Sequence, residues 1–234
     1  MFRKRSALIR NDMNIGFYRA DSKESLEEAF ALVWEEYGKE GYIGADTELK
    51  VPPYDFLPTS ATFVAKSADA VIGMVTLVGD GENGLPMESI YGKEVAGFRT
   101  GGREMAEISQ LAIRRDEAAH ASADRRRFRS DILLSLFRLV YFFAKQAGIG
   151  ILCITINPKH ESFYEAIGFV RFGELKSYPL VNDAPALAMM LPLPDPDMHS
   201  FGQGFVFQEI LKHPLTKEDF SPARTGGLIF SIEC

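Results

Sequence analysis

Two hydrophobic periodicities alternate along the 234-residue chain. Alternating or short continuous apolar runs, which are typical of strands, occur in segments 14–20, 60–66, 70–80, 105–113, 149–156, 169–180 and 184–193. Apolar residues three or four apart, which are typical of helices, occur in segments 21–43, 124–147 and 157–167. The order β, α, β, β, β, α, β, α, β, β predicts an α/β (α+β) fold with a mixed central sheet and helices on both faces.

The predicted helices carry signals for where they begin and end. Asp21 is the expected N-cap of the first helix, and Asn157 with Pro158 is the expected start of the last. Gly148 ends the longest helix. Between the third and fourth strands, residues 81–103 are expected to form a loop with a short helix, which is long enough to build part of a site.

A proline- and glycine-rich join after Pro192 divides the chain in two. Residues 1–193 are expected to form one domain. The C-terminal extension, 194–234, has too few residues for a core of its own. We expect it to dock on the domain or on a partner subunit, which allows for a homodimer.

Composition limits the partners and the cellular compartment that we expect for the protein. The net charge of −6 gives no reason to expect nucleic acid or an anionic membrane surface as a partner. Cys153 and Cys234 are too few for a disulfide framework or a metal-ligand spacing, so a reducing cytoplasm fits best. The longest apolar run, 132–144, is interrupted by Arg138 and is too short to span a bilayer.

The stretch NPKHESFYEAIGF, residues 157–169, is similar to the Asn, Tyr and Gly-Phe signature of the GNAT superfamily of N-acyltransferases. The order of elements agrees, and the resemblance covers about residues 14–193. It implies a GNAT-like acyltransferase fold for domain 1–193.

Three further stretches resemble bacterial N-acyl amino acid synthases of FeeM type. They are GYIGAD (41–46), GLPMESIYGKEV (84–95) and GREMAEISQLAI (102–113). The last is also similar to the Glu-x-Ser-Arg stretch of acyl-homoserine lactone synthases, but Gln110 stands where those enzymes have arginine. This difference counts against a homoserine lactone product.

The segment between the fourth strand and the long helix departs from acetyl-CoA-using members of the superfamily. Those members carry glycines there, whose backbone amides bind the pyrophosphate of the cofactor. Here no glycine occurs between Gly102 and Gly148. FeeM-type enzymes, as the resemblance implies, take a long acyl chain from acyl carrier protein, whose phosphopantetheine arm carries a single phosphate.

Basic residues at the start of the long helix fit such a donor. Arg125, Arg126 and Arg127 oppose the helix dipole, so helix stability does not explain them, whereas an acidic carrier protein and its phosphate would. The alternative is a solvated run balanced by nearby acids. We also expect Leu111, Ile113 and Asn157 to bind the acyl donor and its phosphopantetheine arm.

Amide synthesis from a thioester requires a neutral amine, and a base contributes about 10² to 10⁴ in rate. Strand alternation places Met105, Glu107, Ser109, Leu111 and Ile113 on one face, where the Glu107 carboxyl would be desolvated and its pKa raised. Glu107 is therefore the candidate base, and Ser109 a candidate partner of substrate or water. The alternatives are a glutamate paired with Arg99 or Arg103, and a serine that only fills the strand.

The resemblance implies that Tyr164 protonates the departing thiolate. His160 lies one helical turn before Tyr164. There it would adjust or relay the transfer of the Tyr164 proton, or bind the carboxylate of the amino acid. The alternatives are a core tyrosine and a neutral packing histidine.

For the amino acid acceptor we name Asp80, Tyr42 and Met87, although acids such as Asp80 in a glycine-rich loop are usually just solvated. The expected function is therefore condensation of a long-chain fatty acyl thioester with the α-amine of an amino acid; acyl carrier protein is the expected donor, and coenzyme A is the alternative. No metal or tightly bound cofactor is required. The alternatives are an acetyl-CoA-dependent acetyltransferase, an enzyme like acyl-homoserine lactone synthases, and a non-catalytic module that binds acyl carrier protein.

Overall fold

The computed structural model describes residues 15–44, 59–68, 70–115 and 123–193, with the backbone alone for 123–127. The elements, in chain order, are β1 (Ile15–Arg19), α1 (Lys23–Lys39), β2 (Ser60–Ser67), β3 (Ala70–Gly79), α2 (Glu88–Arg99), β4 (Met105–Ile113), α3 (Ala123–Gln146), β5 (Ile151–Ile156), η2 (Pro158–His160), α4 (Glu161–Ala166), β6 (Val170–Arg171), β7 (Lys176–Tyr178), η3 (Pro179–Val181) and β8 (Ala184–Pro192). The predicted order is confirmed, with the short helix of segment 81–103 present as α2. The predicted strand 169–180 is instead two short strands, β6 and β7. The C-terminal extension, 194–234, lies outside the described residues.

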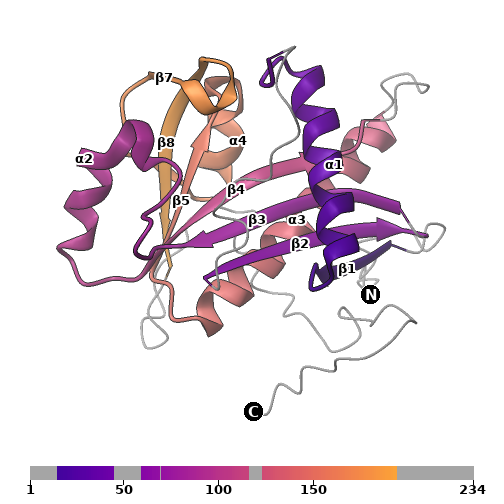
Figure 1. Cartoon of the computed structure of the whole chain (residues 1–234), viewed down its shortest axis with the longest axis horizontal. Coiled ribbons are helices and arrows are strands. Elements are labelled where there is room, and N and C mark those ends of the chain that lie inside the picture. The colour runs from indigo at the N-terminus through magenta and orange to yellow at the C-terminus, as the bar shows by residue number, and fades with distance from the viewer. Residues whose placement is uncertain (1–14, 45–58, 69, 116–122, 194–234) are drawn as a thin grey trace, which may run out of the picture.

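The strands form one mixed sheet in the order β1-β2-β3-β4-β5-β8-β6, with β7 also paired to β8. Six of the seven described pairings are antiparallel, and β4 with β5 is parallel. Figure 1 shows β2, β3 and β4 running across the molecule while β5 and β8 turn away from them. The predicted mixed sheet is thereby confirmed.

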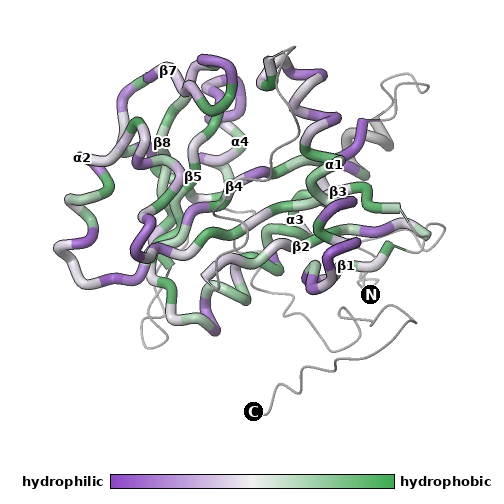
Figure 2. The backbone as a smooth tube through the Cα atoms, viewed as in Figure 1, coloured by the Kyte–Doolittle hydropathy of each residue, from purple (hydrophilic) through white to green (hydrophobic). Residues whose placement is uncertain are grey.

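Helices cover both faces of this sheet. α3 and α4 lie on one face, over the largest cluster of buried side chains, which includes Ala106, Ile108 and Leu152. The alternate residues of the same strands point to the other face, which α1 and α2 cover with two smaller clusters. Figure 1 shows α1 in front of the sheet, α2 to the left of β8 and α3 behind the sheet, and Figure 2 shows hydrophobic green along stretches of the central strands.

α1 packs through the apolar stripe that its sequence predicts. Phe30 and Val33 are buried, and Leu26 and Tyr37 pack against them at the edge. The predicted N-cap was wrong by one residue: the hydroxyl of Ser22, rather than Asp21, accepts a hydrogen bond from the Ser25 N–H at 3.1 Å.

The parallel pairing of β4 and β5 is short. It joins Met105–Ile108 to Ile151–Ile154, whereas β4 continues to Ile113 with β3 as its partner. We call the place where the two strands part, beyond Ile108 and Ile154, the β4–β5 fork.

Candidate active site

Glu107 lies at the base of the β4–β5 fork, with its side chain on the face that α1 and α2 cover. It is 2% exposed, so its carboxyl group is shielded from water. The backbone N–H of Met87 donates to Oε2 at 2.7 Å, and the hydroxyl of Thr155 donates to Oε1 at 3.4 Å. Both partners are neutral. A lone buried carboxyl group held in this way is unusual outside functional sites.

Burial raises the pKa of the Glu107 carboxyl to about 8. The two hydrogen bonds oppose this rise because they stabilise the charged form, and the negative charge of Glu88 adds to it. The group is therefore poised to exchange a proton near neutral pH.

The strand alternation predicted for β4 breaks at Gln110. This residue has a φ of 52°, and one extra residue of β4 stands against β3 between the pairs Thr76–Ser109 and Met74–Ala112. A β-bulge of this kind changes which face the following side chains point to. Ser109 therefore lies near Glu107, half-buried and on the same face.

Leu111 and Ile113 lie on the opposite face. Both pack against the cluster under α3, whereas Ala112 between them packs under α1. The prediction that they share the face of Glu107 was therefore wrong, because it assumed an unbroken alternation. An acyl chain on the Glu107 face would not contact their side chains.

Tyr164 lies on α4, on the opposite face of the sheet from the Glu107 side chain. Its side chain is buried, and its ring packs edge-on against Phe137, Phe163 and Phe169. The pKa of its hydroxyl is raised, chiefly by burial and further by Tyr37 of α1.

His160 does not share the buried position of Tyr164. It ends the 3-10 turn η2 rather than lying in α4, and it is exposed. Partial desolvation and the neighbouring Lys159 lower the pKa of its imidazole, so the ring is neutral at pH 7. Asn157 is the cap predicted from the sequence: its side chain accepts a hydrogen bond from the Lys159 N–H at 3.1 Å.

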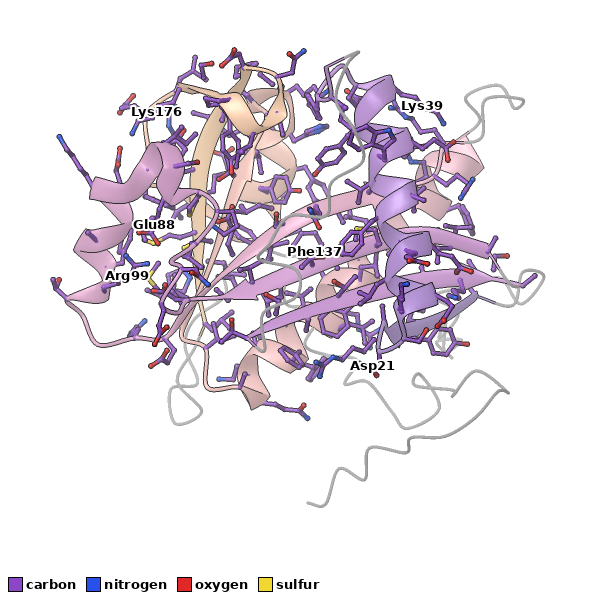
Figure 3. The ribbon with its side chains drawn as sticks, in the orientation of Figure 1. Asp21, Lys39, Glu88, Arg99, Phe137 and Lys176 are labelled. Carbon is purple, nitrogen blue, oxygen red and sulfur yellow. The ribbon has the colours of Figure 1, made fainter. Side chains whose placement is uncertain are left out.

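An arginine clamp fixes the loop that carries Met87. Arg99, at the end of α2, donates to both carboxylate oxygens of Asp80 at 2.7 Å and to Glu88 Oε2 at 2.8 Å. Glu88 in turn accepts the backbone N–H of Leu85 at 2.7 Å. Figure 3 shows Glu88 and Arg99 side by side below α2.

The contacts of the clamp and its loop differ from the roles predicted for three residues. Arg99 pairs with Asp80 and Glu88, so the alternative that it pairs with Glu107 was wrong. Asp80 is engaged by that arginine. Met87 is fully buried beneath α2, and it meets the site through its backbone N–H rather than its side chain.

Glu36 of α1 and Glu40, the residue that follows α1, join the ends of β4 and β5 at the far side of the fork. Arg115, after β4, donates to the buried Glu36 at 2.8 Å and to Glu40 at 2.5 Å, and Lys159, after β5, also donates to Glu40. The Lys159 ammonium lies 5.6 Å from the centre of the Tyr42 ring. Tyr42 therefore lies at the same end of the fork as Glu40.

The predicted donor-binding arginines are only partly described. Arg125, Arg126 and Arg127 lie in the first turns of α3, where the side chains are outside the described residues.

The two groups that sequence reasoning missed are Thr155 and the Met87 N–H. The spacing of Thr155 on a buried strand gave a weak signal, whereas a backbone donor from a distant loop leaves none.

Two searches of the described residues have negative results. No group of three or more histidine, cysteine, aspartate or glutamate side chains is arranged to hold a metal ion. No helix in this part of the chain is both long and apolar enough to cross a membrane.

Comparison with known structures defines the class of the protein. An N-acetyltransferase from Staphylococcus aureus Mu50 matches with a TM-score of 0.50 and 14% identity, over 76% of this chain and 97% of that one. The acyl-homoserine lactone synthase LasI matches with a TM-score of 0.54 and 16% identity, over 78% and 90%. The fold is that of a GNAT-like acyltransferase, as the sequence motifs predicted.

A closer likeness identifies the family. FeeM, an N-acyl amino acid synthase from uncultured soil microbes, matches with a TM-score of 0.67 and 31% identity, over 79% of this chain and 93% of that one. The family model described as N-acyl amino acid synthase FeeM matches residues 28–192. The chain belongs to this family, and it is an N-acyltransferase that uses an acyl thioester and an amino acid. A search of curated proteins finds no match.

Proposed function

We propose that the chain transfers a fatty acyl group from acyl carrier protein to the α-amine of an amino acid at the β4–β5 fork. Glu107 is the general base. The observation that carries this proposal is the buried Glu107 carboxyl, whose described hydrogen-bond partners are neutral and whose pKa is raised to about 8. A base with a pKa near the working pH is the most effective at taking a proton in the transition state.

The reaction balances with two protein groups. The neutral amine attacks the thioester carbonyl carbon, and Glu107 takes the proton that the nitrogen must lose. The tetrahedral intermediate then breaks its C–S bond, and Tyr164 gives its hydroxyl proton to the thiolate. The proton passes back from Glu107 to Tyr164 before the next turnover. The raised pKa of Tyr164 suits this role, because the phenol stays protonated until a thiolate forms.

The fork also offers a place for the donor. β4 extends five residues, 109–113, beyond its last pair with β5, and no strand among the described residues pairs with the edge that faces the fork there. Such an edge binds extended chains through backbone hydrogen bonds. A phosphopantetheine arm is an extended chain with two amide groups, and it would carry the thioester toward Glu107.

Acyl carrier protein is favoured over coenzyme A by two features of the sequence. The segment after β4 has no glycine to expose the backbone amides that bind a pyrophosphate, and three arginines open α3. Arg125, Arg126 and Arg127 would meet the acidic carrier and its phosphate. Asn157, at the end of β5, would hold the donor from the other strand.

The remaining predicted residues have supporting roles in this proposal. Ser109 would hydrogen-bond the acceptor amine or a water molecule beside Glu107. His160 is neutral and exposed, which suits contact with the donor more than a proton relay. Tyr42 would border the acceptor, whereas Asp80 and Met87 act through the loop that holds Glu107.

A panel of donors and acceptors tests the proposal. The purified full chain is incubated with acyl carrier protein or coenzyme A thioesters of several chain lengths and with each of the twenty amino acids, and products are read by mass spectrometry. We expect long-chain N-acyl amino acids from the carrier-bound donors. Glu107→Gln should lower kcat by about 10² to 10⁴, and Tyr164→Phe should also lower it. Full activity of Glu107→Gln would exclude the base role.

The carrier is tested separately. Reversing Arg125, Arg126 and Arg127 to glutamate should raise KM for acyl carrier protein while leaving a short acyl-CoA unaffected. Equal changes for both donors would show that these arginines do not recognise the carrier.

A further inference from the structure

Gln110 has an unusual backbone conformation for its position. Four described residues other than glycine have a positive φ, and three of them, Ala68, Asn182 and Asp183, lie in turns. Gln110 lies inside a strand, with a φ of 52°. This conformation costs about 1 kcal/mol or more for a side chain of this kind, and such strain is concentrated at functional sites. A role for the Gln110 side chain would explain why glycine does not stand there.

A buried chain of hydroxyl groups holds the Gln110 side chain. Thr62 and Thr76, which are 3% exposed and fully buried, share a hydrogen bond of 3.0 Å. The hydroxyl of Thr76 donates to Gln110 Oε1 at 3.4 Å. Because the amide oxygen is engaged by Thr76, the two N–H donors of the amide are left, and no partner for them occurs among the described residues.

The amide lies on the same face of the sheet as Glu107. Val78 is the register partner of Glu107, and Thr76, two residues away on the same strand, points to the same face. Gln110 reaches Thr76, so its side chain is on that face as well. The Glu107 carboxyl and the Gln110 amide therefore lie on the same face of β4, three positions apart.

Their spacing suits an α-amino acid. Three residues of regular strand span about 10 Å, and the bulge at Gln110 shortens this span. In an amino acid, two bonds separate the amine nitrogen from the carboxylate carbon, a distance of roughly 2.5 Å. One hydrogen bond of about 3 Å at each end brings the total close to that span.

A neutral donor also suits the neighbouring base. A cation at Gln110 would lower the pKa of Glu107, whereas an amide binds a carboxylate with little effect on it. The nearest cations described at the far end of the fork, Arg115 and Lys159, are already paired with Glu36 and Glu40.

We propose that Gln110 binds the α-carboxylate of the acceptor through its amide N–H donors, and so selects amino acids over amines without a carboxylate. This inference rests on the proposed function, in which the acceptor amine lies against Glu107. It assigns the acceptor a fixed orientation, with its nitrogen toward Glu107 and its carboxylate toward the bulge of β4.

The test compares two acceptors that differ in the carboxylate alone. The first is an amino acid that the donor-by-acceptor panel shows to be acylated, and the second is the amine left when that amino acid loses its carboxyl group. We expect the wild-type chain to prefer the amino acid in kcat/KM by at least about tenfold. Gln110→Met should raise KM for the amino acid by about 10- to 100-fold and change the amine reaction less than twofold.

Two further variants keep the test independent of folding. Gln110→Asn retains an amide and a residue type that tolerates positive φ, but it withdraws the donors by one methylene, so it should lose the same preference. Gln146→Met makes the same chemical change at an exposed residue of α3 and should leave the preference intact.

The outcomes distinguish a failure of this inference from a failure of the proposed function. If Gln110→Met and Gln110→Asn slow the two acceptors by the same factor, or leave the preference unchanged, Gln110 does not bind the carboxylate, although the synthase activity stands. If the wild-type chain acylates no amino acid, the proposed function fails and this inference with it.

Discussion

In the proposed reaction, Glu107 must lose its own proton before it can take one from an amine. With a pKa of about 8, the group is mostly protonated at pH 7 in the free protein. An acceptor that arrives as an ammonium ion would favour the charged form of Glu107, because opposite charges at close range lower the pKa of a carboxyl group. Substrate binding and activation of the base are therefore coupled at this residue.

The protonation of Glu107 predicts how stability depends on pH. Between the ordinary carboxyl pKa of about 4.3 and the folded value, the folded chain holds a proton that the unfolded chain releases. The free energy of unfolding should therefore fall as pH rises through this range, by up to about 1.4 kcal/mol per pH unit. Glu107→Gln should remove this part of the slope, as measured by urea unfolding between pH 5.5 and 8.5.

Other titrating groups contribute to the pH dependence of the free energy of unfolding in both the wild-type chain and Glu107→Gln. The prediction therefore concerns the difference between the two curves. His160, with its lowered pKa, adds stability as pH rises toward its unfolded value in either protein. Parallel curves for the wild-type chain and Glu107→Gln would mean that Glu107 is charged throughout, contrary to its burial.

At the scale of elements, α2 and its preceding loop act on the site through one hydrogen bond. The Arg99 clamp holds Asp80 and Glu88 together, and the loop between them delivers the Met87 N–H to Glu107. Arg99 thus supports the carboxyl group without contact with it.

Loss of the clamp should change the pH profile of the enzyme. In Arg99→Met, the Met87 N–H is held less firmly and the charge of Glu88 is no longer neutralised, and both changes raise the pKa of Glu107. The acidic limb of kcat/KM should move to higher pH by about 0.5 unit or more. Arg103→Met, which removes an exposed arginine four residues later, is the matched control and should leave the limb in place. A fall in rate without a shift would indicate a merely structural role.

The contact between α1 and the end of β4 contains a buried charge. Glu36 is 5% exposed, and it accepts hydrogen bonds from the backbone and side chain of Arg115. These bonds, with Lys39, hold the pKa of Glu36 below its ordinary value although burial acts to raise it. The pair ties α1 to the open end of the fork.

Removal of Arg115 should be destabilising. Arg115→Met leaves the Glu36 carboxylate buried with Lys39 as its remaining cation, and we expect a loss of about 2 kcal/mol in the free energy of unfolding. Arg114→Met is the control, because Arg114 pairs with the exposed Glu35 at 3.5 Å, and it should cost less than about 1 kcal/mol. Equal losses in denaturant unfolding would assign the effect to the strand end rather than to the buried pair.

For the whole molecule, the sequence predicted the order of elements well because hydrophobic periodicity is a local signal. It failed at Gln110, where a single bulge moved Leu111 and Ile113 to the other face, and it offered no signal for the burial of Glu36. The partner of Glu36 lies 79 residues along the chain. Such features depend on contacts between distant segments, whereas Asn157 caps its turn through a neighbour two residues away and could be read directly.

The same distinction explains what was predicted of the site. The burial of Glu107 could be predicted because a carboxylate among apolar strand residues is conspicuous in the sequence. The Met87 N–H that binds it was not, since a backbone donor carries no residue signature. The clamp that turns Asp80 into a partner of Arg99 likewise depends on a loop closing onto the end of its own helix.

The short parallel pairing of β4 and β5 has a consequence for amide hydrogen exchange. Four residue pairs join two antiparallel half-sheets, β1–β4 and β5–β8, so the seam between them should open more readily than either half. Exchange measured by mass spectrometry should be faster in peptides from residues 109–113 and 154–157 than in β2 and β3. An acyl thioester that binds along the seam should slow exchange on both sides of it, and the chain would be most uniformly protected when its substrate completes the sheet.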